Sequence, residues 1–273
     1  MSELLTDWGI DPAWLVKAVF EANMLLLFGI CLAHSLRTHG WRRTLREFVG
    51  GFLLTALCES AGVLSGAYVY PGFEFYILAT PVANPVGWVA LVYIIMTLTD
   101  RLVFGRKALE SLEQPLPDRK PMLLRGSLTT TILLLALCDG LLAVMLDLVL
   151  DPLATIYNWW IWVPVEPGVS TIEQGAVQAY NFDHHVWMTT PDNPVAGWFS
   201  GYFPEGNRYP TRVFGIPLIN FIAWLVFVFV FTAQFRWIES RQQWGEWKKT
   251  IVLWGLIVVN VPILCFVLIA PNL

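Results

Sequence analysis

Three aspartates occur in one strongly apolar stretch, LCDGLLAVMLDLVLDP (residues 137–152), namely Asp139, Asp147 and Asp151. An ionisable side chain in the middle of a membrane-spanning helix costs about 2.5–3.5 kcal/mol on insertion scales, so it usually has a partner or a function. At about 100° per residue, Asp139 and Asp147 differ by about 80° around a helix, and Asp147 and Asp151 by about 40°. All three carboxyl groups can therefore face the interior of a helical bundle.

Three more polar residues lie in other apolar stretches: Glu21, Glu59 and Asn220. A carboxyl group in apolar surroundings can act as a general acid, because lost solvation disfavours its charged form, and a second carboxylate can then accept a proton from water. Glu59 and Asp147 are the acids that a structural role explains least well. We therefore predict a catalytic group of Glu59, Asp147 and Asn220, with the amide orienting water or a carboxyl group.

The other acids have structural explanations of equal weight. Asp139 could bond to a neighbouring helix, and Glu21 could simply reach the outer membrane interface. Asp151 precedes Pro152, and the residue before a proline usually stands at the end of a helix. These three acids are candidates for contact with a substrate rather than for catalysis.

The elements that must position these residues are membrane helices. Of the 273 residues, 56% are hydrophobic and 14% charged, whereas soluble domains are about a quarter charged. Six stretches are long and apolar enough for a bilayer span of about 20 residues: 15–35, 48–67, 76–98, 127–150, 214–236 and 250–270. Because Pro81 and Pro85 interrupt the third stretch, its helix either has an irregular outer end or starts later. We predict an all-α membrane protein, a single transmembrane domain over residues 1–273 with about six helices.

The basic residues predict the orientation. Most of the 17 Lys and Arg residues lie in three predicted loops, residues 36–47, 99–126 and 236–249. Loops rich in Lys and Arg stay in the cytoplasm, so we predict that both termini are extracytoplasmic, in a bacterial or archaeal cytoplasmic membrane. In this orientation Glu21, Glu59, Asp147 and Asn220 lie in the outer half of the membrane, and no acid lies deep in the inner half.

One connection is too long for a compact bundle. Residues 151–213 join the fourth and fifth predicted helices, and loops above about 15 residues are usually functional or disordered. Disordered segments contain few aromatic residues, but this connection has several tryptophans: Trp159, Trp160, Trp162, Trp187 and Trp198. We predict an ordered cap on the outer membrane surface, with residues 163–213 as an extracytoplasmic insertion.

The sequence contains no motif for a metal or a bound cofactor. His184 and His185 follow Asp183, but a metal site needs three or four ligands, and His34 and His39 fall on the opposite membrane face. The four cysteines lie in apolar runs without a C-x-x-C pair, so we expect core residues. The net charge of −4 argues against a nucleic acid partner.

Four motifs, in this order, resemble a known family: ESAGVLSGAYVY from Glu59, TPVANPVGW from Thr80, LDLVLDPLATIYNWWIW from Leu146 and FGIPLINFIAW from Phe214. The family is that of integral-membrane carotenoid biosynthesis proteins, which includes carotenoid 1,2-hydratases of the bisanhydrobacterioruberin hydratase type. The resemblance covers roughly residues 15–165 and 213–270. The sequence departs from the family pattern in the long 163–213 segment and at Ala223, where a glycine is expected.

The resemblance implies a hydratase, a lyase that adds water across the terminal C1–C2 double bond of an acyclic carotenoid or related polyisoprenoid. The positions that match the family are Glu59, Tyr68, Tyr70, Asp147, Asp151, Trp160, Trp162, Pro217, Asn220 and Trp224. We predict that Asp147 protonates the alkene to a tertiary carbocation and that Glu59 takes a proton from the attacking water. The reverse assignment stays open. The predicted substrate-binding residues are Tyr68, Tyr70, Trp88, Asp151, Trp160, Trp162, Trp224, Glu21 and Asp139. Their partner would be a hydrophobic polyene or isoprenoid taken from the bilayer lipids.

Three other functions are compatible with the residues. The same helices could host another isoprenoid modification that proceeds through a carbocation. Intramembrane acids also suit a proton-coupled transporter. Two observations argue against it: the sequence shows no inverted repeat, and no acid in the inner half of the membrane would complete a proton path. A lipid- or carotenoid-binding membrane protein would explain the tryptophans but not Glu59 and Asp147.

Overall fold

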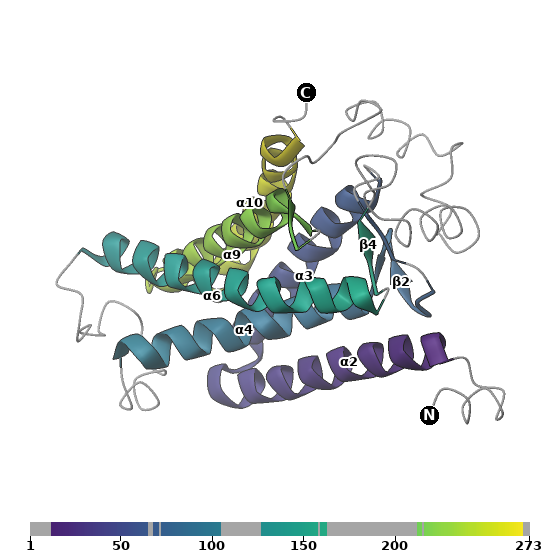
Figure 1. The fold of residues 1–273 in the computed structure, drawn as a ribbon. Helices are drawn as coiled ribbons and strands as arrows, with labels where there is room; N and C mark the ends of the chain where they lie inside the picture. The colour runs from purple at the N-terminus through teal and green to yellow at the C-terminus, as the bar shows by residue number, and fades with distance from the viewer. Residues whose placement is uncertain are drawn as a thin grey trace.

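The computed structural model describes residues 12–64, 68–70, 72–104, 127–157, 159–162, 212–214 and 216–269. Apart from Arg212 and Val213, the predicted cap lies outside these residues. Figure 1 shows that the described part is mainly long helices. They are α2 (Pro12–His39), α3 (Trp41–Leu64), α4 (Ala83–Phe104), α6 (Leu128–Ile156), α9 (Leu218–Glu239) and α10 (Glu246–Ile269).

Each predicted span falls on one of these helices, so the predicted all-α membrane protein is confirmed. Among the described residues, five helical segments are long and apolar enough to cross a membrane: Trp14–His39, Ala83–Val103, Leu128–Ala154, Leu218–Glu239 and Glu246–Cys265. The sixth helix, α3, is more polar because its first two turns carry Arg42, Arg43, Arg46 and Glu47. It still packs within the bundle, against α4 and α10.

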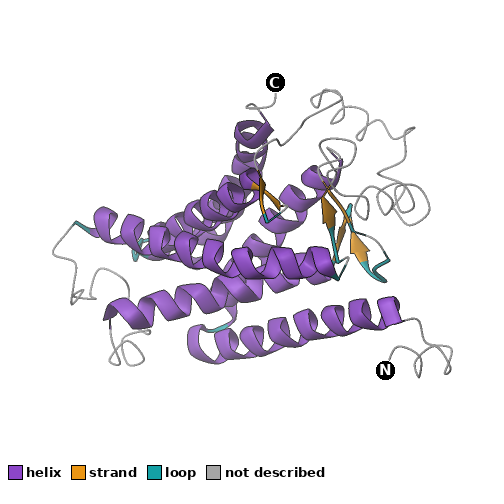
Figure 2. Ribbon diagram, in the orientation of Figure 1, coloured by secondary structure: helices purple, strands orange, loops and turns teal. Residues whose placement is uncertain are grey.

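Short strands, orange in Figure 2, lie at one end of the bundle. β1 (Tyr68–Val69) pairs with β4 (Ile161–Trp162), β2 (Tyr76–Ile77) with β3 (Thr80–Pro81), and β5 (Arg212–Val213) with β6 (Ile216–Pro217), all antiparallel. We call this the strand end; here α2, α4 and α9 begin and α3 and α6 finish. The opposite end, where α3 and α10 begin, is the arginine end. The later helix start that Pro81 and Pro85 allowed is confirmed, because α4 starts only at Ala83, after β2 and β3.

Two predicted helix boundaries are wrong. Instead of a loop over residues 36–47, a single residue, Gly40, joins α2 to α3; it has a φ of 76°, which glycine adopts without strain. At the other end of the bundle α6 continues through Pro152 to Ile156, although Asp151 was expected at the helix end. A proline in a helix removes one backbone hydrogen bond, but the helical pattern resumes after it, with Tyr157 N–H donating to the Leu153 carbonyl oxygen at 3.0 Å. Asp151 therefore lies within the helix, one turn after Asp147.

The helices pack side by side around an apolar core. α6 lies along α9, α2 along α4, and α10 contacts both α3 and α9. The main core cluster includes Trp88 and Ile95 of α4, Phe231 and Phe235 of α9, and Leu253 of α10. The cluster also includes Leu54 of α3 and Ala143 of α6, so it fixes the spacing of α3, α6 and α9, the helices that carry the predicted catalytic residues.

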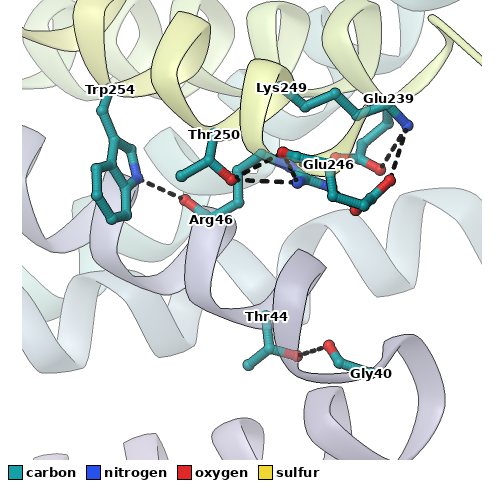
Figure 3. A network of polar contacts seen from close by, with 8 residues as sticks. All are labelled: Gly40, Thr44, Arg46, Glu239, Glu246, Lys249, Thr250 and Trp254. Carbon is teal, nitrogen blue, oxygen red and sulfur yellow. Dashed lines mark hydrogen bonds and ion pairs between the residues drawn. The ribbon is translucent and has the colours of Figure 1, made fainter. Parts of the chain in front are cut away.

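At the arginine end, an ionic network joins α3 to α9 and α10 (Figure 3). Arg46 is fully buried and its guanidinium lies 2.5 Å from Glu239 and 3.2 Å from Glu246. Lys249 lies 3.6 Å from Glu246, and the Trp254 indole donates to the Arg46 carbonyl oxygen at 3.3 Å. The network neutralises the charge of Arg46, which was predicted to lie in the cytoplasmic loop 36–47.

A second buried ionic group lies deeper, where α4, α6 and α9 meet. Arg236 is 3% exposed; it donates to both carboxylate oxygens of Asp139 and, at 3.3 Å, to Asp100. Asp100 and Arg236 fall in the predicted basic loops 99–126 and 236–249, but α4 extends to Phe104 and α9 to Glu239, so both side chains lie inside the bundle. The carboxylates neutralise a guanidinium that would otherwise be unpaired in an apolar interior.

Candidate active site

A cavity of about 130 Å³ lies near the strand end, between α2, α3, α4, α6 and α9. It brings together nine predicted site residues from five separate stretches of the sequence. These are Glu59, Tyr68, Tyr70, Trp88, Asp147, Asp151, Trp160, Asn220 and Trp224. The predicted catalytic group of Glu59, Asp147 and Asn220 thus shares one cavity.

Glu59 is held by the two tyrosines that follow α3. Tyr68 donates to Glu59 Oε2 at 2.7 Å and Tyr70 donates to the same oxygen at 2.5 Å. The Tyr68 phenol reaches back along α3 because residue 62 is glycine; a Cβ there would lie 2.3 Å from the phenol oxygen. Burial, reinforced by the Glu59 charge, raises the pKa of both phenols well above the usual value, so both act as donors.

Asp147 and Asp151 are joined by one amide. Asn220 Nδ2 donates to Asp147 Oδ2 at 2.7 Å and to Asp151 Oδ2 at 2.5 Å. Asp151 also accepts a hydrogen bond from the Trp160 indole through its other oxygen. Both carboxyl groups are buried, at 1% and 2% exposure. The two carboxyl groups of α6, one helical turn apart, are therefore both hydrogen-bonded to one side chain, Asn220, in the first turn of α9.

Aromatic rings form much of the remaining wall. The rings of Trp88 and Trp224 lie 4.7 Å apart between centroids and are tilted by 30°. Elsewhere in the wall, Phe20 of α2 stacks on Trp159 at 4.3 Å, and Tyr70 meets Trp160 edge-on at 6.1 Å. A carboxyl-rich cavity with such walls can hold an apolar group against acids and can stabilise a positive charge over a ring face.

Three predicted site residues are placed differently. Asp139 does not line the cavity and instead pairs with Arg236. Glu21 does not line it either; its carboxylate accepts the backbone N–H of Phe75 at 3.4 Å, next to the β2–β3 hairpin. Trp162 lies in β4 with its backbone paired to Tyr68, and its side chain is outside the described part. Both acids thus have a structural partner away from the cavity.

The hairpin that Glu21 supports positions the tyrosines. Tyr76 donates to the Tyr70 carbonyl oxygen at 2.5 Å, and Ser60 Oγ accepts the backbone N–H of Ala79 at 3.2 Å. These bonds tie the β2–β3 hairpin to the end of α3. The Tyr70 backbone is therefore held by the hairpin, while its hydroxyl donates to Glu59.

Sequence reasoning missed eight cavity residues: Phe20, Met24, Ala83, Asn84, Gly87, Leu91, Leu150 and Trp159. Asn84 hydrogen-bonds Tyr70, and it stands inside the motif TPVANPVGW, where an amide between two prolines was a usable signal. Gly87 stands in the same motif. Phe20 and Met24 carried no signal, since apolar residues on a membrane helix are ordinary.

The described residues hold no group of three or more His, Cys, Asp or Glu side chains arranged for a metal ion. The pair His184 and His185 lies outside the described residues. The four cysteines include one contact that the sequence did not predict: Cys58 of α3 hydrogen-bonds Cys265 of α10.

Fold and site together define a multi-pass helical membrane protein with an acidic, aromatic-walled cavity inside its bundle. The chain belongs to the family described as carotenoid biosynthesis protein, which it matches over residues 19–271. This confirms the resemblance drawn from the four motifs. No curated protein and no solved structure matches the chain.

Proposed function

We propose that the protein is a carotenoid hydratase that adds water to the terminal double bond of an acyclic carotenoid end group. The observation that carries this proposal is the convergence of three carboxyl groups, Glu59, Asp147 and Asp151, on one aromatic-walled cavity. Alkene hydration needs an acid for one carbon, a base for the attacking water and a surface that tolerates a cation. The cavity is several times larger than a single water requires, which leaves room for an end group beside the water.

The hydrogen bonds favour Asp147 as the acid. Glu59 accepts from two phenols and Asp151 from an amide and an indole, so both are held as acceptors. Among the described residues, Asp147 accepts only from Asn220. Three like charges around one small cavity repel one another, so the carboxyl with the fewest hydrogen-bond donors is the one that keeps a proton. In this assignment Asp147 holds that proton. The Asn220 amide, which bonds both aspartates, keeps the Asp147 carboxyl group next to that of Asp151.

In the proposed reaction, Asp147 transfers its proton to C2 of the end group and the π electrons form the new C–H bond. C1 becomes a tertiary carbocation, which the faces of Trp88 and Trp224 can stabilise. A water oxygen bonds to C1 while Glu59 takes the water proton, giving a tertiary alcohol. Because Glu59 and Asp147 share the cavity, water there can return the proton to Asp147 for the next turnover.

Expression in a lycopene-producing host tests the proposal. We expect pigments that have gained the mass of one water at an end group, detected by chromatography and mass spectrometry. An unchanged pigment profile, with the protein present in the membrane, would contradict hydration of lycopene.

A second candidate keeps the cation but changes its fate. The Trp88–Trp224 wall would support another isoprenoid modification through a carbocation, such as isomerisation, because loss of a proton to Glu59 can replace attack by water. The same experiment separates the two, since an isomer elutes differently but keeps the mass of its precursor.

Filling the cavity is expected to weaken substrate binding. A Cβ at Gly87 would lie 2.7 Å from Met24 Sδ, so Gly87→Leu should push Met24 into the cavity. We expect KM for the carotenoid to rise about tenfold or conversion to stop, measured in isolated membranes, because lost apolar contact costs about 0.8 kcal/mol per methylene.

The matched control is Gly29→Leu in α2, where a Cβ would meet nothing within 4 Å. It should leave KM unchanged. Equal effects of both substitutions would show that leucine disturbs the bundle in general and not the cavity.

A further inference from the structure

A second hollow lies between α2 and α3, nearer the arginine end. It is a groove of about 370 Å³, bordered by Phe28, Leu32 and Leu36 on α2 and by Phe48 and Phe52 on α3. Its one polar lining residue, Thr44, bonds the Ser35 hydroxyl and the Gly40 carbonyl oxygen. The groove therefore suits an uncharged hydrocarbon.

The groove and the cavity follow the same faces of the same two helices. Along α2, Phe20 and Met24 line the cavity, and Phe28 and Leu32 line the groove, at intervals of one helical turn. Along α3, Glu59 lines the cavity and Phe52, two turns away, lines the groove. Two turns of helix are about 11 Å, and the series from Phe20 to Leu36 spans about 24 Å.

We propose that this groove binds the polyene chain of the substrate while the end group lies in the cavity, an inference that rests on the proposed function. A conjugated polyene is straight and stiff, so an end group held between Glu59 and Asp147 fixes the direction in which the chain leaves. The seam between α2 and α3 runs in one direction, and its length is comparable to the thickness of the hydrocarbon core of a bilayer, about 30 Å.

The lining is suited to such an occupant. Phe28 and Phe48 meet edge-on at 5.4 Å between ring centroids and give the groove an aromatic wall. Leu36 and Trp41 at the far end are 43% and 52% exposed, so the groove is open to the membrane and a long chain can enter sideways. The groove sets a minimum length for a tightly held substrate.

The test blocks the groove without touching the cavity. Leu32→Trp fills the groove from α2, and Val49→Trp fills it from α3. Ile30→Trp is the matched control, because Ile30 is 58% exposed and does not line the groove. Each variant is purified in detergent from a lycopene-producing host, and gel filtration verifies that it is folded.

We expect Leu32→Trp and Val49→Trp to lower the lycopene bound per protein about tenfold, and Ile30→Trp to leave it unchanged. In membranes, both groove variants should raise KM for lycopene without lowering kcat. The short terpene myrcene, which has the same end group but no long chain, should be converted as by the unaltered protein.

Equal lycopene binding by all three variants would overturn the proposal, and so would the absence of bound lycopene in the unaltered protein. Loss of co-purified phospholipid, without loss of lycopene, would identify the groove as a lipid site instead. Lycopene that is bound through the groove but never hydrated would contradict the proposed function alone.

Discussion

Asp147→Asn is expected to lower hydration about a hundredfold to ten-thousandfold, the range that a positioned general acid contributes. The substituted amide keeps the size of the side chain and can still bond Asn220, but it has no acidic proton to give to C2. The rate of alcohol formation is measured in membranes that contain equal amounts of each variant. Glu59→Gln should cause a loss of similar size, because the attacking water then lacks its proton acceptor.

Glu74→Gln is the matched control. Glu74 is an exposed acid at the same end of the bundle, where it accepts from the Trp14 indole at 2.7 Å, and it does not line the cavity. Its substitution should leave the rate unchanged. Full activity of Asp147→Asn would overturn the assignment of Asp147 as the acid, and full activity of both cavity variants would overturn the acid–base mechanism.

Arg236→Met is expected to have the largest effect on stability, a loss of about 3–5 kcal/mol. The substitution leaves the Asp139 and Asp100 carboxylates inside the bundle without their cation. We expect a clear fall in the Tm of the purified protein, followed by fluorescence-detected gel filtration after heating in detergent. Hydration by the surviving folded fraction should be normal, because Arg236 does not line the cavity.

Two further variants separate a broken ion pair from a general loss of packing. Arg101→Met removes an exposed arginine from α4 and should change stability by at most about 0.5 kcal/mol. Adding Asp139→Leu and Asp100→Leu to Arg236→Met should recover most of the Tm, since apolar residues of similar size often replace buried ion pairs without loss. An unchanged Tm for Arg236→Met alone would contradict a structural role for this group.

The sequence could show that acids lie within the helices, but it could not show which side chains they pair with. Asp139, Asp147 and Asp151 all face the bundle interior, as their helical angles allow. Yet α6 delivers Asp139 to a guanidinium and the other two to an amide. Arg236 was assigned to the predicted basic loop 236–249 because the apolar stretch 214–236 ends at this residue. A buried cation is tolerated only when its anions arrive from other helices, which no single stretch reveals.

The sequence by itself determined the class of the protein, its long apolar helices and its family, because hydrophobic length and short ordered motifs are local properties. It also determined the three acids of the cavity and Asn220, since acids and amides inside apolar helices are rare enough to stand out. Only the tertiary structure decided which acids share a cavity, that Pro152 lies inside α6, and that Phe20, Gly87 and Trp159 complete the wall. Those outcomes depend on how helices distant in sequence pack against one another, and side-chain contacts across helices are not encoded in any one of them.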